Sequence, residues 1–429
     1  MKRAVVVGSG AAGATAAKAL QGLFDVTVFE SGPEYHPLRL SLATVEKAKR
    51  LGLLFNSREA GLVYPAMRTA RTKDGMILVW GRATGGTTPL MTANALRLDG
   101  DLRKMGVDLD REFGELAGEI PISTGHSARW RESTRRLFEV FGEMGLEARP
   151  MPKMAEAGKC LNCGRCILGC PSGAKWDARR FLDEARARGA EVLTGTVVET
   201  IVARSGAASG VVVRRRGRRR FVPADLVILA AGGFGTPAIL ANSGIACESR
   251  LFVDPVLCVA AEWPGALQNR DVPMAFAAQL DGFILSPYFD FLSYYFDRRW
   301  RAPAEDIVSL MIKLADSSEG EIRGRRIHKP LTADDREGLA RAARLAEDVL
   351  ARLGIPRGRT FLGTLNAGHP GGMLSLTAAE AETLRNPRLP ANVYVADATL
   401  LPRSLGNPPS LTLMALARKV SRTAAARFA

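Results

Sequence analysis

The chain has 429 residues, of which 47% are hydrophobic and 24% are charged, and its mean hydropathy is close to zero. This composition is ordinary for a soluble globular protein and leaves room for two or three packed regions with a large core. The net charge is +15. Nucleic acid is a poor candidate partner, because no recognition motif accompanies the positive charge.

The N-terminal segment predicts a βαβ unit that binds a dinucleotide. An apolar strand over residues 4–7 is followed by a glycine-rich turn and a helix from Ala14. Free amides and the helix dipole favour a pyrophosphate at this turn. The next strand ends at an acidic residue about 20 residues further on, where a carboxylate bonds the ribose hydroxyls. The candidate residues are Gly8, Gly10, Gly13 and Glu30. The alternative is a glycine-rich turn without a ligand.

The N-terminal segment and the longest apolar stretch indicate whether the chain is exported or inserted into a membrane. The first residues enter the strand directly, so we expect no signal peptide and a cytoplasmic chain, or one exported folded on a partner's signal. Residues 226–246 are the longest apolar stretch, but glycines, a proline and an asparagine interrupt them. We therefore expect a buried strand, a turn and a helix there instead of a membrane span.

The remaining elements alternate between helices and strands. A second glycine-rich loop spans residues 81–88. Helices are expected over 102–118, 128–146, 178–188, 332–353 and 410–428, and strands over 191–203, 210–216, 226–231 and 392–396. Strand-like, aromatic-rich segments dominate from 253 to about 296. This order indicates that the first and last segments share one nucleotide-binding domain, interrupted by a second domain.

A compact cysteine run follows the helix predicted over 128–146. Four of the six cysteines and a proline have the spacing C-x2-C-x2-C-x3-C-P, formed by Cys160, Cys163, Cys166, Cys170 and Pro171. This is the bacterial ferredoxin run, which holds an iron–sulfur cluster by thiolates. Zinc, disulfides and chance are the alternatives, but zinc ligands usually form two separated pairs. A [4Fe–4S] cluster is favoured, and a [3Fe–4S] cluster remains open because the fourth cysteine can serve another cluster.

For two further clusters, of arginines and of aromatic residues, both a structural explanation and a binding function are open. The arginine run over 214–220 is expected at the tip of a β-hairpin, as a solvated turn; docking to an acidic partner or an anionic membrane surface is the alternative. The aromatic residues over 283–300 are expected in a core, with a partner-facing or quinone-facing surface as the alternative. Lys159, Arg165 and Lys175 are expected to surround the thiolates with positive charge.

These motifs together resemble the glucose–methanol–choline (GMC) family of FAD-dependent oxidoreductases over nearly the full length. The resemblance is carried by Gly85-Gly86-Thr87-Thr88 with Arg97, by 227–233 with Thr236-Pro237, by 368–372 around His369, by 393–398 ending in Asp397-Ala398, and by Asn407-Pro408. The cysteine run is similar to that of the family's iron–sulfur branch, which includes bacterial sugar dehydrogenases. One departure is Met91, which stands where the family usually has an asparagine; Asn94 is a substitute.

The resemblance implies an α/β fold in three stretches of sequence. Residues 1–252 form the first part of a Rossmann-like, GMC-type FAD-binding domain, with the iron–sulfur loop over 150–180. Residues 253–365 form an inserted, smaller α+β substrate or cap domain, trimmed relative to typical members. Residues 366–429 complete the FAD-binding domain and carry the catalytic histidine and asparagine.

The resemblance also implies roles for single residues. His369 would take the proton of a substrate hydroxyl, and Asn407 would hold the same oxygen by a hydrogen bond. The implied FAD contacts, beyond the N-terminal set, are Gly85, Gly86, Thr87, Val198, Asp397 and Pro408. Asp397 could alternatively cap a helix.

The expected function is oxidation of an alcohol or sugar hydroxyl to a carbonyl, with electrons passing from FAD through the cluster to an acceptor. The acceptor would be a cytochrome, a ferredoxin-like protein or a quinone-linked subunit, with peripheral membrane association through that partner. The alternatives are a GMC-type oxidase that uses oxygen, a non-redox lyase or isomerase with FAD as a scaffold, and a non-catalytic electron-transfer subunit. His369 and Asn407 argue against the last.

Overall fold

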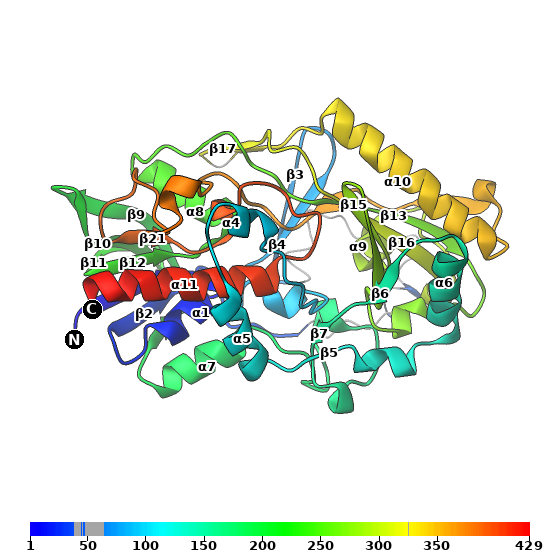
Figure 1. The fold of residues 1–429 in the computed structure, drawn as a ribbon, viewed down its shortest axis with the longest axis horizontal. Helices are drawn as coiled ribbons and strands as arrows, with labels where there is room; N and C mark the ends of the chain where they lie inside the picture. Colours follow the sequence, from blue (N-terminus) through cyan, green and yellow to red (C-terminus); the bar gives the residue numbers. More distant parts are fainter. Residues whose placement is uncertain (38–43, 45, 48–63, 325) are drawn as a thin grey trace.

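The computed structural model describes residues 1–37, 44, 46–47, 64–324 and 326–429. The molecule is elongated, with a parallel sheet at the end that carries both termini and a larger, mainly antiparallel sheet toward the other end (Figure 1). The pocket described below lies between these two parts of the fold.

The parallel sheet is built from both ends of the chain. Its strands, in spatial order, are β21 (Val393–Val395), β12 (Leu226–Leu229), β1 (Arg3–Val7), β2 (Asp25–Phe29) and β8 (Glu191–Leu193). All residues of β12 and β21 are buried, as expected for the continuous apolar strands of a sheet covered on both faces. The helices of this region are α1 (Ala11–Ala19), α5 (Asp110–Glu119), α7 (Arg179–Ala187), α8 (Gly232–Asn242) and α11 (Ser410–Phe428). Helices α1 and α11 pack against each other beside the sheet (Figure 1).

A separate three-stranded sheet lies next to this region. It consists of β9 (Thr196–Arg204), β10 (Ala207–Arg215) and β11 (Arg218–Pro223). Arg215 pairs with Arg218 across the β10–β11 turn, so the structure confirms the predicted hairpin with arginines at its tip.

The second large sheet runs in the order β3 (Met67–Arg71), β4 (Ile77–Gly81), β20 (Asn366–Ala367), β13 (Pro255–Glu262), β16 (Ile307–Leu314), β15 (Phe283–Pro287), β14 (Phe276–Leu280) and β6 (Ala148–Pro150), and β19 (Thr360–Leu362) also pairs with β13. Successive side chains of a strand point to opposite faces. In β16, Val308, Leu310 and Ile312 belong to the core cluster under α6 (Glu132–Glu143) and α10 (Ala333–Arg352). Ile307 and Met311 belong to the aromatic cluster on the other face.

Several predicted elements divide in the structure at glycines in the left-handed region. The predicted helix over 102–118 is two helices, α4 (Gly100–Lys104) and α5, separated after Gly106 at φ 90°. The predicted strand over 191–203 is β8 and β9, separated by Gly195 at φ 63°. The aromatic segment also contains a helix, α9 (Phe291–Phe296), with Asp290 as its N-cap.

Short strands complete the fold: β5 (Ile122–Ser123), β7 (Lys153–Met154), β17 (Glu321–Arg323) and β18 (Arg326–His328).

The predicted C-terminal helices agree closely with the structure. Helix α10 has Thr332 as its N-cap, with reciprocal bonds between Thr332 and Asp335 that satisfy the first free amides. Within the described part of the chain, no helix combines the length and apolarity needed to cross a membrane.

Candidate active site

The two glycine-rich loops contact each other at the carboxyl end of the parallel sheet. Gly8 has φ 98°, and a Cβ there would lie 2.4 Å from the Ala230 carbonyl oxygen. A Cβ on Gly13 would lie 2.0 Å from the oxygen of Gly8, and one on Gly86 would lie 2.7 Å from the Cα of Gly10. Only glycine fits such approaches. The loops therefore form a backbone cradle at the start of α1, which fits the pyrophosphate of a dinucleotide.

Glu30 and Thr87 hold these loops in place. The Glu30 carboxylate is buried and accepts hydrogen bonds from Ser9 Oγ at 2.6 Å and from Gly32 N at 2.7 Å. Thr87 Oγ1 accepts a hydrogen bond from Gly81 N at 3.0 Å. Glu30 thus lies beside the predicted pyrophosphate loop at the end of β2, where a ribose would lie, while already bonded to the loop.

Asp397 and Val198, two other predicted FAD contacts, are both buried. Asp397 Oδ2 accepts from Thr236 Oγ1 at 2.6 Å and from Gly232 N at 2.8 Å, so this carboxylate lies at the start of α8. Asp397 also caps the short helix that follows it, and burial raises the pKa of its carboxyl above the usual range. Val198 is buried in β9.

His369 lies beside a buried carboxylate because of strand pairing. Strand β20 ends two residues before His369, β13 begins one residue after Asp254, and Pro255 pairs with Ala367. His369 Nδ1 is 3.2 Å from Asp254 Oδ2. The His369 side chain is 27% exposed because it faces a pocket, whereas the Asp254 side chain is 1% exposed.

Asp254 is surrounded by donors. Lys313 Nζ lies 3.4 Å from Asp254 Oδ2 in a buried ion pair, and Gly406 N donates to Oδ1 at 3.3 Å. Ser404 Oγ also donates to Oδ1. Burial by itself would raise the pKa of Asp254, but Lys313, His369 and Ser404 hold it below its usual value. The carboxylate is therefore charged and fixed, and it orients the His369 ring through Nδ1.

The electrostatic surroundings keep the His369 ring neutral. Burial and the Lys313 charge lower the pKa of His369 below its ordinary 6.5, although Asp254 acts in the opposite direction. A neutral ring whose Nδ1–H donates to Asp254 leaves Nε2 free to accept a proton. Burial also lowers the pKa of Lys313.

Sequence analysis did not identify Asp254 or Lys313. A signal for Lys313 exists, because it is the one charged residue in the strand sequence Ile307–Leu314, whose eight residues are all buried. Asp254 has left-handed backbone geometry, with φ 53°, directly before Pro255. Neither feature indicates on its own that the two residues meet behind His369.

A pocket of about 240 Å³ lies in front of His369. His369 and Pro408 both line it, together with Thr87 from the second glycine-rich loop. Met91, which stands where the resemblance predicts an asparagine, and Asn94 also line it. Asn407 is buried and is not among the described lining residues; its Nδ2 donates to Gln279 Oε1 at 2.8 Å.

The cysteine run adjoins this pocket. Ile167 and Leu168 line the pocket, while Cys166 lines a smaller cavity together with Cys160 and Cys170. Cys163 lines a third cavity instead. Among the residues that the structure describes, no group of three or more His, Cys, Asp or Glu side chains is arranged to hold a metal ion. Three of the four thiols share one cavity, but the described thiols are not arranged as the ligands of a metal centre.

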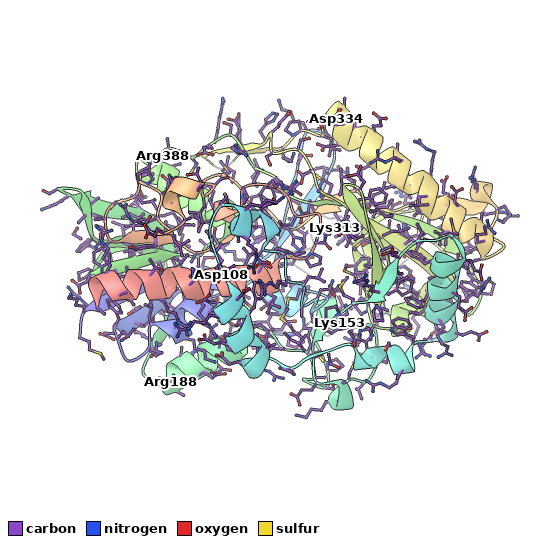
Figure 2. All side chains as sticks on the ribbon, viewed as in Figure 1. Asp108, Lys153, Arg188, Lys313, Asp334 and Arg388 are labelled. Carbon is purple, nitrogen blue, oxygen red and sulfur yellow. The ribbon has the colours of Figure 1, made fainter. Side chains whose placement is uncertain are left out.

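Two buried lysines flank the cavity that Cys166 lines. Lys175 Nζ donates to the carbonyl oxygens of Pro89 at 2.6 Å and Cys166 at 2.8 Å, which connects the second glycine-rich loop to the cysteine loop. Lys153 Nζ donates to the Pro273 carbonyl at 2.7 Å. Burial lowers the pKa of Lys153 to about 7 and that of Lys175 to about 8. Figure 2 shows that Lys153 and Lys313 both lie toward the middle of the molecule.

The lysines that the structure places near the thiols are not all the ones that the sequence predicts. Lys175 lies at the cavity, as predicted, and Lys153 is an additional lysine that the sequence did not reveal. Lys159 instead forms an exposed ion pair with Glu156, with an Nζ–Oε2 distance of 2.6 Å. The aromatic residues form a buried cluster, as predicted, and several of them also face the pocket, among them Phe291 and Tyr295.

The chain is similar to known proteins both in sequence and in fold. The family model described as GMC oxidoreductase matches residues 103–258. An uncharacterized GMC-type oxidoreductase of Mycobacterium tuberculosis is 29% identical over 488 residues, covering 97% of this chain and 75% of the relative. Pyridoxine 4-oxidase from Mesorbium loti has a TM-score of 0.70 at 18% identity, covering 98% of this chain and 99% of that one.

A second solved structure extends the similarity in fold. A formate oxidase of Aspergillus oryzae, studied for its FAD modification, has a TM-score of 0.72 at 13% identity. The match covers 99% of this chain and 98% of the formate oxidase chain. The matched family model describes oxidoreductases, and the formate oxidase structure concerns FAD modification. The chain is therefore similar in sequence to GMC oxidoreductases and has the same mixed α/β fold as the two oxidases.

Proposed function

We propose that this protein oxidises an alcohol hydroxyl to a carbonyl, with His369 as the base that takes the hydroxyl proton. The observation that carries the proposal is the position of His369 between a buried carboxylate and an open pocket. Its Nδ1 lies 3.2 Å from Asp254, and its side chain faces the pocket that the second glycine-rich loop also lines. Bound FAD would supply the hydride acceptor.

The protein's own residues have separable tasks in this reaction. Asp254 fixes the tautomer and orientation of His369, so that Nε2 faces the substrate oxygen. Lys313 neutralises the buried carboxylate and helps to keep the imidazole neutral before the proton arrives. Asn407 remains a predicted second contact to the substrate oxygen. It would have to exchange its present hydrogen bond to Gln279 for one to the substrate.

The substitutions His369→Ala and His369→Asn test this assignment. Both should load FAD normally, because His369 does not contribute to the glycine cradle. Their turnover should fall by about 10²- to 10⁴-fold, the usual contribution of general acid–base catalysis. Normal turnover in FAD-loaded variants would show that another group takes the proton.

We further propose that the cysteine run holds an iron–sulfur cluster that passes electrons to an external acceptor. Three thiols line one cavity, and two buried lysines adjoin it. Buried cations are retained where an anion compensates them, and a thiolate-ligated cluster is anionic. Cys163 lines another cavity. Among the described residues no three thiols are arranged around one metal position, so a [4Fe–4S] or a [3Fe–4S] centre would require the loop to bring the thiols together.

The cluster proposal has its own test. Protein purified without air should contain iron and acid-labile sulfide and show an EPR signal after reduction or oxidation. Protein that is loaded with FAD but free of iron and sulfide would refute the cluster while leaving the alcohol chemistry intact. Stoichiometric release of peroxide in air would favour an oxidase. Turnover without bleaching of the flavin would favour a non-redox reaction with FAD as a scaffold.

A further inference from the structure

The pocket in front of His369 has the lining of a site for an apolar body. Aromatic side chains from α9 and the segment before it form one part of the wall, and methionines from several elements form another. These residues are Tyr288, Phe291, Tyr295, Phe296, Met67, Met91, Met274 and Met311. Trp80, Ile167 and Leu168 extend the apolar lining toward the β3–β4 hairpin and the cysteine loop.

Strand alternation explains why this wall is apolar. The face of β16 that is turned away from α10 carries Ile307, Ser309, Met311 and Lys313, and the last two of these reach the pocket. Val256 of β13 lies on the same face and also lines the pocket. The second sheet thus presents apolar side chains, with one lysine at the end near His369.

Several polar side chains of the lining are already bonded within the protein, whereas the Tyr295 hydroxyl is buried without a hydrogen-bond partner among the described residues. Lys313 is paired with Asp254. Asn94 accepts a hydrogen bond from Lys153, and Asn366 Nδ2 donates to a backbone carbonyl at 3.0 Å. The Asp290 carboxylate caps α9. Among the described lining residues, His369 is the group whose orientation leaves a ring nitrogen facing the open space.

We infer that the substrate is an alcohol with a bulky apolar body and a single reacting hydroxyl, and not a sugar; this inference rests on the proposed alcohol oxidation. A sugar would bring several hydroxyls against aromatic rings and methionines. Each buried hydroxyl without a partner reduces affinity by about 5- to 150-fold. By contrast, each buried methylene group of an apolar alcohol increases affinity about fourfold. The hydroxyl of such an alcohol has a partner in His369.

The test compares alcohols on FAD-loaded protein without oxygen. Benzyl alcohol, cyclohexylmethanol and 1-octanol form one set, and glucose, sorbitol and glycerol form the other. The rate of flavin bleaching gives kcat/KM for each. We expect the apolar set to exceed the sugar set by at least about 100-fold, which corresponds to two unpaired hydroxyls at about tenfold each, toward the lower end of the range above. A higher kcat/KM for sugars would overturn the inference while supporting alcohol oxidation.

A binding measurement separates this inference from the proposed reaction. The tertiary alcohol 2-phenyl-2-propanol has no hydrogen on its carbinol carbon and cannot be oxidised, but it matches the proposed pocket. Its binding is followed by the flavin difference spectrum. Saturable binding of this alcohol without bleaching by any alcohol would support the apolar site and refute alcohol oxidation. Absence of both binding and bleaching would overturn the inference.

Phe296→Ala probes the wall directly. Phe296 is partly buried, lines the pocket and lies 6.3 Å from the Tyr295 ring, between ring centroids. Its loss should raise KM for benzyl alcohol about tenfold with kcat nearly unchanged, because it removes binding that is equal in the ground and transition states. Phe296→Tyr should restore KM. Phe221→Ala, at a 46% exposed phenylalanine of β11, is the matched control. An unchanged KM in a folded, FAD-loaded Phe296→Ala variant would contradict the inference.

Discussion

The substitution Asp254→Asn removes the charge behind His369 while keeping the side-chain shape. Asparagine tolerates the left-handed backbone of this residue, which has φ 53°. A charge-assisted hydrogen bond contributes about 1.5–3 kcal/mol. Loss of the carboxylate should therefore lower the pKa of His369 still further, because the protonated ring loses its anionic partner. The asparagine amide can also donate to Nδ1 and select the wrong tautomer, so kcat should fall about 100-fold or more.

The assay is the pH dependence of kcat/KM, measured from flavin bleaching. In the wild type, the acidic limb should lie below the ordinary histidine value of 6.5, because burial and Lys313 lower the pKa of His369. Asp254→Asn should move this limb to lower pH. Lys313→Met should move it to higher pH, since it removes a nearby positive charge.

A double variant serves as the control for a loss of folding stability. Asp254→Asn alone leaves Lys313 buried without its partner, which can destabilise a protein by about 3–5 kcal/mol. Asp254→Asn combined with Lys313→Met removes both charges and should recover much of that stability without recovering kcat. The two substitutions shift the acidic limb in opposite directions, so the double variant is judged by kcat, and a wild-type kcat would refute the role of Asp254 as the positioning residue.

Three further predictions concern the cradle, the cysteine loop and acid stability. Gly8→Ala should abolish FAD loading and lower Tm, because its Cβ would lie 2.4 Å from a backbone oxygen; Gly22→Ala, at positive φ but in open space, should retain FAD. Lys175→Met should loosen the cysteine loop, seen as faster alkylation of its thiols, whereas Lys159→Met at an exposed ion pair should not. The pKa of Glu115 is lowered to about 2 by arginine hydrogen bonds, so its stabilising contribution is full above pH 4.5 and is lost as the pH falls toward 2. Urea unfolding of Glu115→Gln should accordingly show a smaller loss of stability over that pH interval than the wild type; an equal loss would contradict this assignment.

The local elements of the nucleotide-binding part were largely predictable from sequence. Its strands are continuous apolar runs, and its glycines occur where close backbone contact is required, as at Gly8 and Gly13. Helix α11 has the predicted bounds of 410–428. Such features depend on residues near one another in the chain, so periodicity and turn chemistry reveal them. The division of one predicted helix at Gly106 was missed, because a single glycine is tolerated within many helices.

The sequence by itself determined the glycine cradle, the cysteine spacing and the identity of His369 as the candidate base. Only the tertiary structure decided what surrounds that base. Asp254, Lys313 and His369 come from three separate segments, and they meet because β13 pairs with both β16 and β20. The same pairing places an apolar wall opposite the histidine. Long-range strand register has no signal in a single sequence, since each strand shows only which of its side chains share a face, and not which strand lies beside it.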